Sequence, residues 1–119
     1  MIKYLKLSFL MVFFSGTLLA QQSSVYTHEL TDFNRAVELY KDKQYQAAQI
    51  LFDKVKSKTD NMEVESDCAY YIANCAIRLD QMGADFLVES FVEDYPTSTK
   101  TNQAYIEVAH YYFDQGNYP

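Results

Sequence analysis

Thiol chemistry in this 119-residue chain depends on two cysteines, Cys68 and Cys75, which stand seven positions apart. On an intact helix their Cα atoms would lie roughly 10 Å apart, beyond the roughly 4.4 to 6.8 Å that a disulfide tolerates. A metal site would need further ligands, and the chain has two histidines, His28 and His110. The spacing therefore predicts two small buried thiols, with no disulfide between them and no metal site.

Acid–base and nucleophilic catalysis find little support in the other polar residues. His110 has no cysteine or serine at the spacing of a known catalytic motif, and three glycines leave little room for a phosphate-binding loop. Glu63, Glu65 and Asp67 are better explained as the solvated start of a helix. We therefore expect a binding protein that is not an enzyme and has no cofactor.

The charge of the chain excludes nucleic acid as a partner. The chain has 10 basic and 16 acidic residues, and the first 20 residues contribute two of the lysines and no acid. Residues 21–119 therefore hold 8 basic and 16 acidic residues, a formal charge of −8. Such a surface repels a phosphate backbone and suits basic or neutral protein partners.

The N-terminal residues have the pattern of a secretory signal peptide. Two lysines precede an apolar run from Leu7 to Leu19, and Ala20 then leads into polar residues. The run of about 13 residues is shorter than the roughly 20 that span a bilayer. We expect a signal peptide over residues 1–20 that is cleaved after Ala20, a polar linker over 21–28, and no stable membrane span afterwards; a retained anchor is the alternative.

Helical periodicity continues through the rest of the chain, and the sequence lacks strand-like alternation, so the predicted class is all-α. Asp60 with Glu63 is the expected capping pair of the third helix, and Ser98 is the expected N-cap of the fifth. The fourth helix lies between breaks at Gly83 and Pro96, and a further break follows at Gly116. The other helices are expected at about Glu29–Lys41, Tyr45–Lys56, Met62–Leu79 and Thr99–Asp114.

A motif recurs along these helices at a nearly constant interval. Ala36, Ala73 and Ala109 are 37 and 36 positions apart, and Tyr45 and Tyr118 are 73 apart. A period near 36 is typical of a solenoid of stacked antiparallel helical pairs.

The repeated unit resembles the tetratricopeptide repeat (TPR). The first copy has small and large residues where that family places them, at Ala36, Leu39, Tyr45, Ala48, Phe52 and Val55. The second copy keeps the offsets of 4 and 3 in Ala84, Val88 and Phe91, but its turn is one residue shorter and Gln81 or Met82 replaces the turn tyrosine. The resemblance divides the chain into repeats over about 29–60, 61–96 and an incomplete 97–119.

The segment Tyr95-Pro96-Thr97-Ser98 resembles the junction between repeats in envelope proteins of Gram-negative bacteria. Examples are the outer-membrane assembly lipoprotein and the Tol-Pal coordinator protein. The resemblance implies a non-catalytic scaffold that is exported to the periplasm or the outer-membrane periphery.

The same resemblance implies that the first helices of the pairs line a concave groove for a peptide or a partner helix. The groove positions carried over from the family are Phe33, Val37, Tyr40, Lys41, Tyr70, Asn74, Arg78, His110 and Phe113. In relatives that grip a C-terminal carboxylate, an asparagine and basic residues occupy places like those of Asn74 and Arg78. Here Val37 stands where a second asparagine would be, and an ordinary solvated helix face remains the other interpretation of this pair.

The third copy lacks its second helix, so Ala104, Val108, Ala109 and Tyr112 are expected to be uncovered. We expect the chain to be the N-terminal part of a longer repeat protein; cover from a partner chain is the alternative. Two other functions stay open, namely an accessory domain at the front of a larger exported enzyme or transporter component, and a glycan-binding module.

The first prediction concerns export, because residues 1–24 combine positive charge, a short apolar run and a polar stretch after it. Protein recovered from the envelope fraction should begin at or within a few residues of Gln21 by N-terminal sequencing. Recovery of an intact Met1 terminus in the cytosol would contradict the signal peptide.

Overall fold

The computed structural model describes residues 28–116, and within that range the chain is entirely helical, with five helices and no strand. The all-α class predicted from the sequence is thereby confirmed. The chain divides into two compact units, Met1–Thr31 and Asp32–Pro119. The described part of the first unit is the helical stretch 28–31, and the second unit contains everything that follows. The expected signal peptide lies outside the described residues.

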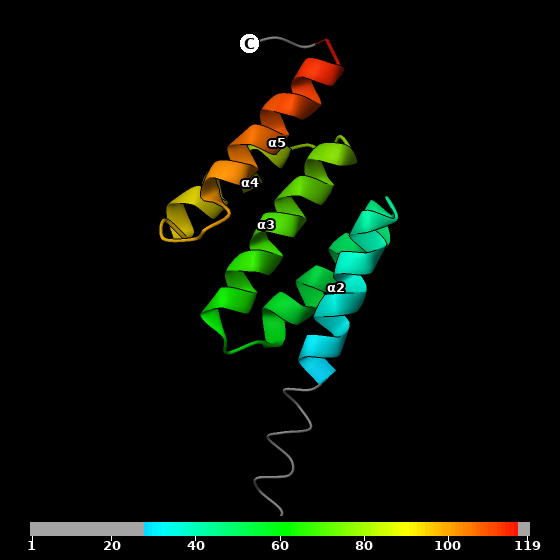
Figure 1. Cartoon of the computed structure of the whole chain (residues 1–119), viewed down its shortest axis with the longest axis vertical. Coiled ribbons are helices and arrows are strands. Elements are labelled where there is room, and N and C mark those ends of the chain that lie inside the picture. Colours follow the sequence, from blue (N-terminus) through cyan, green and yellow to red (C-terminus); the bar gives the residue numbers. More distant parts are fainter. Residues whose placement is uncertain (1–27, 117–119) are drawn as a thin grey trace, which may run out of the picture. The chain divides into compact units, whose positions relative to one another are not determined.

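The helices agree closely with the periodicity of the sequence. A helix covers residues 28–41, and it is followed by α2 (Tyr45–Lys58), α3 (Met62–Arg78), α4 (Ala84–Asp94) and α5 (Thr101–Asp114). Contacts join α3 to α2, α4 and α5, so α3 is the central helix of the second unit. Figure 1 shows α3 between the helix that ends at residue 41 and α5.

The N-terminal cap of α3 differs from the expectation. The side chain of Asn61, and not that of Asp60, accepts hydrogen bonds from the backbone amides of Glu63 at 2.9 Å and Val64 at 3.3 Å. A cap must directly precede the first helical residue to reach these free amides. Asp60 is one residue too early, so the predicted pair of Asp60 with Glu63 is wrong.

The start of α5 also lies later than expected. Its N-cap position is occupied by Lys100, which makes no side-chain capping bond. The hydroxyl of Ser98 instead accepts a hydrogen bond from the backbone N–H of Lys100, at 3.2 Å. Ser98 therefore stabilises the turn before the helix, and α5 begins at Thr101 instead of Thr99.

One turn geometry ends three of the helices. Lys43, Asp80 and Gly116 all have a positive φ, of 62°, 53° and 71°, and they are spaced by 37 and 36 residues. Each amide donates to a carbonyl three residues earlier, at 3.0 to 3.1 Å. After the first two, the next amides, of Gln44 and Gln81, donate to carbonyls five residues earlier, which completes a Schellman motif. The repeat in the sequence is therefore also a repeat in the backbone.

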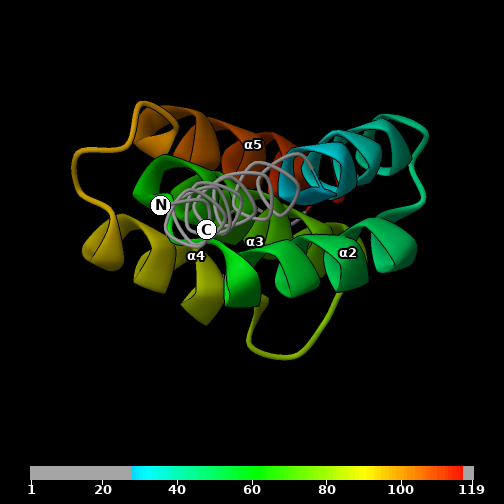
Figure 2. The same cartoon turned by 90° about the horizontal axis from the view of Figure 1, so that it is seen from below.

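The apolar residues of α2 and those of α4 pack against two different faces of α3. The buried residues of α2 form one cluster with both cysteines of α3. This cluster consists of Ala36, Ala48, Phe52, Val55, Cys68 and Cys75. The buried residues of α4 belong to two further clusters on another face of α3. One contains Ala73, Ala76, Ile77, Ala84 and Val88, and the other contains Tyr70, Phe91 and Ala104. Figure 2 shows the consequence, with α2 and α4 on one side of α3 and the helix ending at residue 41 and α5 on the other.

The expectation that α5 exposes Ala104, Val108 and Tyr112 is wrong for these residues. Ala104 is 2% exposed, Val108 packs on the α3–α4 cluster, and the hydroxyl of Tyr112 donates to Asp85 of α4. Their spacing places them on the side of α5 that faces α4. The exposed apolar residues of α5 lie on another side and are Tyr105, Ile106, Ala109 and Phe113.

The second prediction concerns the packing of α2. Two adjacent alanines of this helix differ in burial, so one serves as a control for the other. Ala48 is 0% exposed, whereas Ala47 is exposed. Ala48→Leu should lower the free energy of unfolding by about 1–3 kcal/mol through overpacking, whereas Ala47→Leu should change it by less than about 0.5 kcal/mol. Urea titration of the full chain measures both, and equal effects would mean that the buried face of α2 is assigned incorrectly.

Candidate functional site

Four donors from three helices meet at the carboxylate of Glu107, on α5. Its Oε1 accepts from the hydroxyl of Tyr70 at 2.8 Å and from Nε2 of Gln103 at 3.2 Å. Its Oε2 accepts from the hydroxyl of Tyr40 at 3.2 Å and from Nη2 of Arg78 at 3.4 Å. These five residues, here called the Glu107 cluster, tie together helices that are up to 67 residues apart in the sequence.

Arg78 completes the cluster by contacting the aromatic residues of the first pair. Its Nε donates to the hydroxyl of Tyr40 at 3.3 Å, and its guanidinium carbon lies 6.0 Å and 5.5 Å from the ring centres of Tyr40 and Tyr45. The positive charge is thus held by a carboxylate, a hydroxyl and two ring faces. The side chain of Arg78 is about one-third exposed.

Burial raises the pKa values of both tyrosine hydroxyls in this cluster. It raises the pKa of Tyr40 to about 12, with the hydrogen bond from Arg78 acting against this shift and the charge of Glu107 adding to it. Burial and the hydrogen bond to Glu107 also raise the pKa of Tyr70. The pKa of Arg78 is raised as well, because its bonds to Tyr40 and Glu107 outweigh the loss of solvation. Two hydroxyls, one guanidinium and the amide of Gln103 thus donate to the carboxylate of Glu107.

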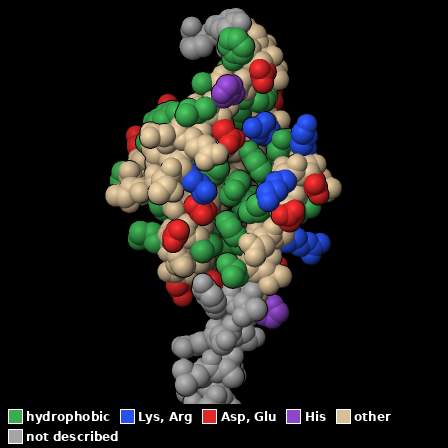
Figure 3. Space-filling model, in the orientation of Figure 1, with side chains coloured by type: hydrophobic (Ala, Val, Ile, Leu, Met, Phe, Trp, Pro, Cys, Tyr) green, Lys and Arg blue, Asp and Glu red, His purple; other side chains and the backbone are tan. Residues whose placement is uncertain are grey.

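A second polar contact on the same helices lies around Tyr71. Lys100 forms an ion pair with Asp67 at 3.9 Å, and its ammonium lies 5.6 Å and 5.8 Å from the ring centres of Tyr70 and Tyr71. Burial raises the pKa of the Asp67 carboxyl, and Lys100 counteracts the shift. Tyr71 stacks on Phe52 with ring centres 4.6 Å apart. Figure 3 shows the resulting surface, with apolar side chains gathered in the middle and charged side chains around them.

The structure brings three of the nine predicted groove residues together, namely Tyr40, Tyr70 and Arg78. Asn74 is 2% exposed, and its amide donates to the backbone carbonyl of Tyr70. Phe33 and Val37 are partly buried against the α2 cluster.

The other predicted groove residues lie on the surface. Lys41 is exposed and pairs with Glu38 at 3.2 Å, and His110 and Phe113 are exposed on α5. That the nine residues bind a partner stays a prediction.

Sequence reasoning missed Glu107, Gln103, Tyr71 and Lys100. One signal for Glu107 was available, because it is an acid beside the apolar residues Ala104, Val108 and Tyr111 of one helix. Its pairing with Tyr40, Tyr70 and Arg78 was not predictable, since these three residues lie 29 to 67 positions away.

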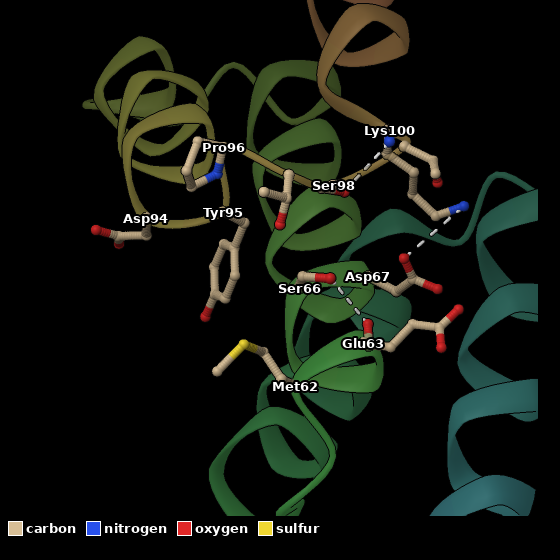
Figure 4. A pocket seen from close by; sticks show the side chains of 11 residues that line it. Met62, Glu63, Ser66, Asp67, Asp94, Tyr95, Pro96, Ser98 and Lys100 are labelled. Carbon is tan, nitrogen blue, oxygen red and sulfur yellow. Dashed lines mark hydrogen bonds and ion pairs between the residues drawn. The ribbon is translucent and has the colours of Figure 1, made fainter.

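The start of α3 and the loop after α4 border a cleft of about 590 Å³ (Figure 4). Its lining includes three carboxylates, several hydroxyls and one ammonium group: Met62, Glu63, Ser66, Asp67, Asp94, Tyr95, Pro96, Thr97, Ser98, Thr99 and Lys100. Ser66 donates to the backbone carbonyl of Glu63 at 2.9 Å, and Lys100 is held by Asp67. The serine and the lysine are thus engaged in local contacts and are not arranged as a nucleophile with its base.

Both cysteines behave as buried thiols, as the sequence predicts. Cys68 and Cys75 are free, 0% exposed and on α3. Burial raises the pKa of each thiol to about 12, so the reactive thiolate is scarce at neutral pH. Across residues 28–116, His, Cys, Asp and Glu form no group of three that could hold a metal ion. No helix in that range is both long and apolar enough to span a membrane.

Comparison of the chain with protein-family models, with curated proteins and with solved structures gives no match. The helical packing is compatible with an α-solenoid.

The Glu107 cluster makes the third prediction. Glu107→Ala leaves the hydroxyl of Tyr70, a residue only 2% exposed, without its acceptor. The free energy of unfolding should fall by about 1–3 kcal/mol, the cost of an unsatisfied buried polar group. Glu93→Ala, at an exposed acid of α4, is the control and should cost less than about 0.5 kcal/mol.

A Tyr70→Phe background isolates the contact. If the hydroxyl and the carboxylate interact as described, Glu107→Ala should cost clearly less there than in the wild type. Additivity of the two substitutions within about 0.5 kcal/mol in urea titrations would show that the two groups are not coupled.

Proposed function

We propose that this protein is a TPR-type helical-repeat scaffold that binds other proteins and catalyses no reaction. The observation that carries the proposal is the repeated turn at Lys43, Asp80 and Gly116, which has the same interval as the repeated alanines. A backbone that repeats in this way stacks helical pairs side by side, and such stacks present extended binding surfaces. The sequence pattern of residues 1–24 supports export to the periplasm or the outer-membrane periphery.

The proposed binding surface is the face shared by the helix that ends at residue 41, α3 and α5. Aromatic rings and paired charges alternate across it, from the Glu107 cluster to Lys100 and Tyr71. Aromatic and arginine side chains are enriched where proteins bind each other. An extended peptide or a partner helix is the ligand that such a surface suits.

A C-terminal carboxylate is not the feature that we expect this surface to recognise. The amide of Asn74 is buried against its own helix, and Arg78 is already paired with Glu107. A ligand carboxylate would have to compete with an internal carboxylate that accepts four hydrogen bonds. Apolar ligand side chains that pack on the aromatic rings fit the surface better.

Site-specific photo-cross-linking tests the proposal. A benzophenone amino acid is placed at Lys41 or His110, both exposed and predicted to lie on the binding face, or at Asp53 of α2 or Glu89 of α4, both exposed on the other helices. In cells of the source organism, irradiation should give protein adducts from the first two positions and not from the other two. The adducts are measured as mass-shifted bands on immunoblots of the envelope fraction.

Equal adducts from all four positions would mean that contact is non-specific. Adducts confined to Asp53 and Glu89 would place the binding surface on α2 and α4, and would contradict the proposed face.

A further inference from the structure

The two cysteines of α3 share one face of the helix and one buried cluster. Cys68 and Cys75 are free, 0% exposed and packed with Phe52 and Val55 of α2. Because they are seven positions apart on a continuous helix, their Cα atoms lie roughly 10 Å apart along its axis. A disulfide requires roughly 4.4 to 6.8 Å between these atoms. The folded helix therefore keeps the two residues too far apart to be bridged.

A bridge would need a turn in the middle of α3, and the residues between the cysteines make contacts that a turn would break. The hydroxyl of Tyr70 donates to Glu107 of α5 at 2.8 Å. Tyr71 stacks on Phe52 of α2, and Ala73 packs in a cluster with residues of α4. Because α3 contacts α2, α4 and α5, a break in it removes the surface on which all three pack.

Folding also protects the thiols from oxidation. Thiol–disulfide exchange begins when a thiolate attacks a disulfide sulfur, and it needs access to the attacking thiol. Both thiols are fully buried, and burial raises the pKa of each to about 12. In an unfolded chain the pKa of a cysteine is about 8.5, and neighbouring helices do not cover the sulfur. The folded chain is therefore much less reactive than the unfolded one.

The unfolded chain, in contrast, is well suited to form this disulfide. The segment between the cysteines is Ala-Tyr-Tyr-Ile-Ala-Asn, which contains no proline, and the chain has no third cysteine to compete. The entropic cost of closing a flexible loop grows with its length, so a loop of this size is favourable to close. One spacing thus forbids the bridge on the helix and permits it in the unfolded chain.

We propose that Cys68 and Cys75 form a redox switch of folding, in which native α3 and a Cys68–Cys75 disulfide exclude each other. A chain that folds first keeps both thiols reduced. A chain that is oxidised before it folds cannot form α3 across the bridge, and it stays unfolded until a thiol reductant cleaves the disulfide. The proposal does not depend on the binding face proposed above.

The oxidant in this scheme is a small-molecule disulfide such as glutathione disulfide. The thiolate of one cysteine attacks it and forms a mixed disulfide, with release of one glutathione thiolate. The second cysteine thiolate attacks the protein sulfur of the mixed disulfide, forms the Cys68–Cys75 bond and releases the second glutathione. Two protein thiols are thus oxidised, and one glutathione disulfide is reduced to two thiols.

Oxidation of the full chain in two states tests the first half of the proposal. The reduced protein is incubated with glutathione disulfide at mildly alkaline pH, once in buffer and once in urea, and timed samples are alkylated and weighed by mass spectrometry. In urea the chain should lose the mass of two hydrogen atoms. In buffer this loss should be at least about 100-fold slower, because only the small unfolded fraction reacts.

Removal of the urea tests the second half. The oxidised chain should lack the helical circular dichroism and the cooperative urea transition of the reduced chain, and dithiothreitol should restore both. Wild-type chain taken through urea without oxidant, and the double variant Cys68→Ala/Cys75→Ala taken through with oxidant, are the controls and should refold. Because alanine leaves space in the buried cluster, rescue by dithiothreitol tests the disulfide independently of the stability of the variant.

Recovery of the native transition by a chain that carries the Cys68–Cys75 disulfide would overturn the proposal. Oxidation in buffer as fast as in urea would contradict the protection of the thiols by folding. An unfolded chain that keeps both thiols, or that stops at a mixed disulfide with glutathione, would show that the pair does not form the bridge and would equally overturn the proposal.

Discussion

The close approach of two helices to α3 is the constraint on which the rest of the structure depends. Small side chains make this approach possible, since Cys68, Ala73, Cys75 and Ala76 are all at most 2% exposed. Their size lets Phe52 of α2 pack on the two cysteines and Val88 of α4 pack on the two alanines, where larger residues would force the helices apart. The two cysteines are therefore explained by packing, which also accounts for their raised pKa values.

Polar contacts then fix the relative placement of the helices, which the packing of small residues alone does not determine. Apolar surfaces attract without strong direction, whereas the hydrogen bonds to Glu107 require a particular placement of the helices that bear Tyr40, Tyr70 and Arg78. A carboxylate with four donors satisfies the hydroxyl of a nearly buried tyrosine and the charge of an arginine at once. The same bonds occupy the donor groups of Tyr40, Tyr70 and Arg78, which come from two different helices.

The turns translate the repeat of the sequence into a repeat of the backbone. Lys43 and Asp80 take a positive φ although they have side chains, which costs energy relative to glycine. The bonds of the Schellman motif offset this cost at both turns. Each turn sends the chain back along the helix that it has just left, and so supplies the antiparallel partner. On α5 no described helix covers the equivalent face, which leaves Ile106 and Ala109 exposed.

The sequence by itself determined the helices, their approximate bounds and the burial of Ala48, Ala84 and both cysteines, because these follow from periodicity over a few neighbouring residues. It was less accurate at helix starts, where one position separates Asp60 from the true cap Asn61. Only the tertiary structure decided which side of α5 faces α4, since Val108 and Ala109 are both apolar and differ by one step around the helix. Only the tertiary structure showed that Glu107 accepts a hydrogen bond from Tyr40. This bond joins residues 67 positions apart and depends on the packing of three helices, so no periodic pattern in the sequence predicts it.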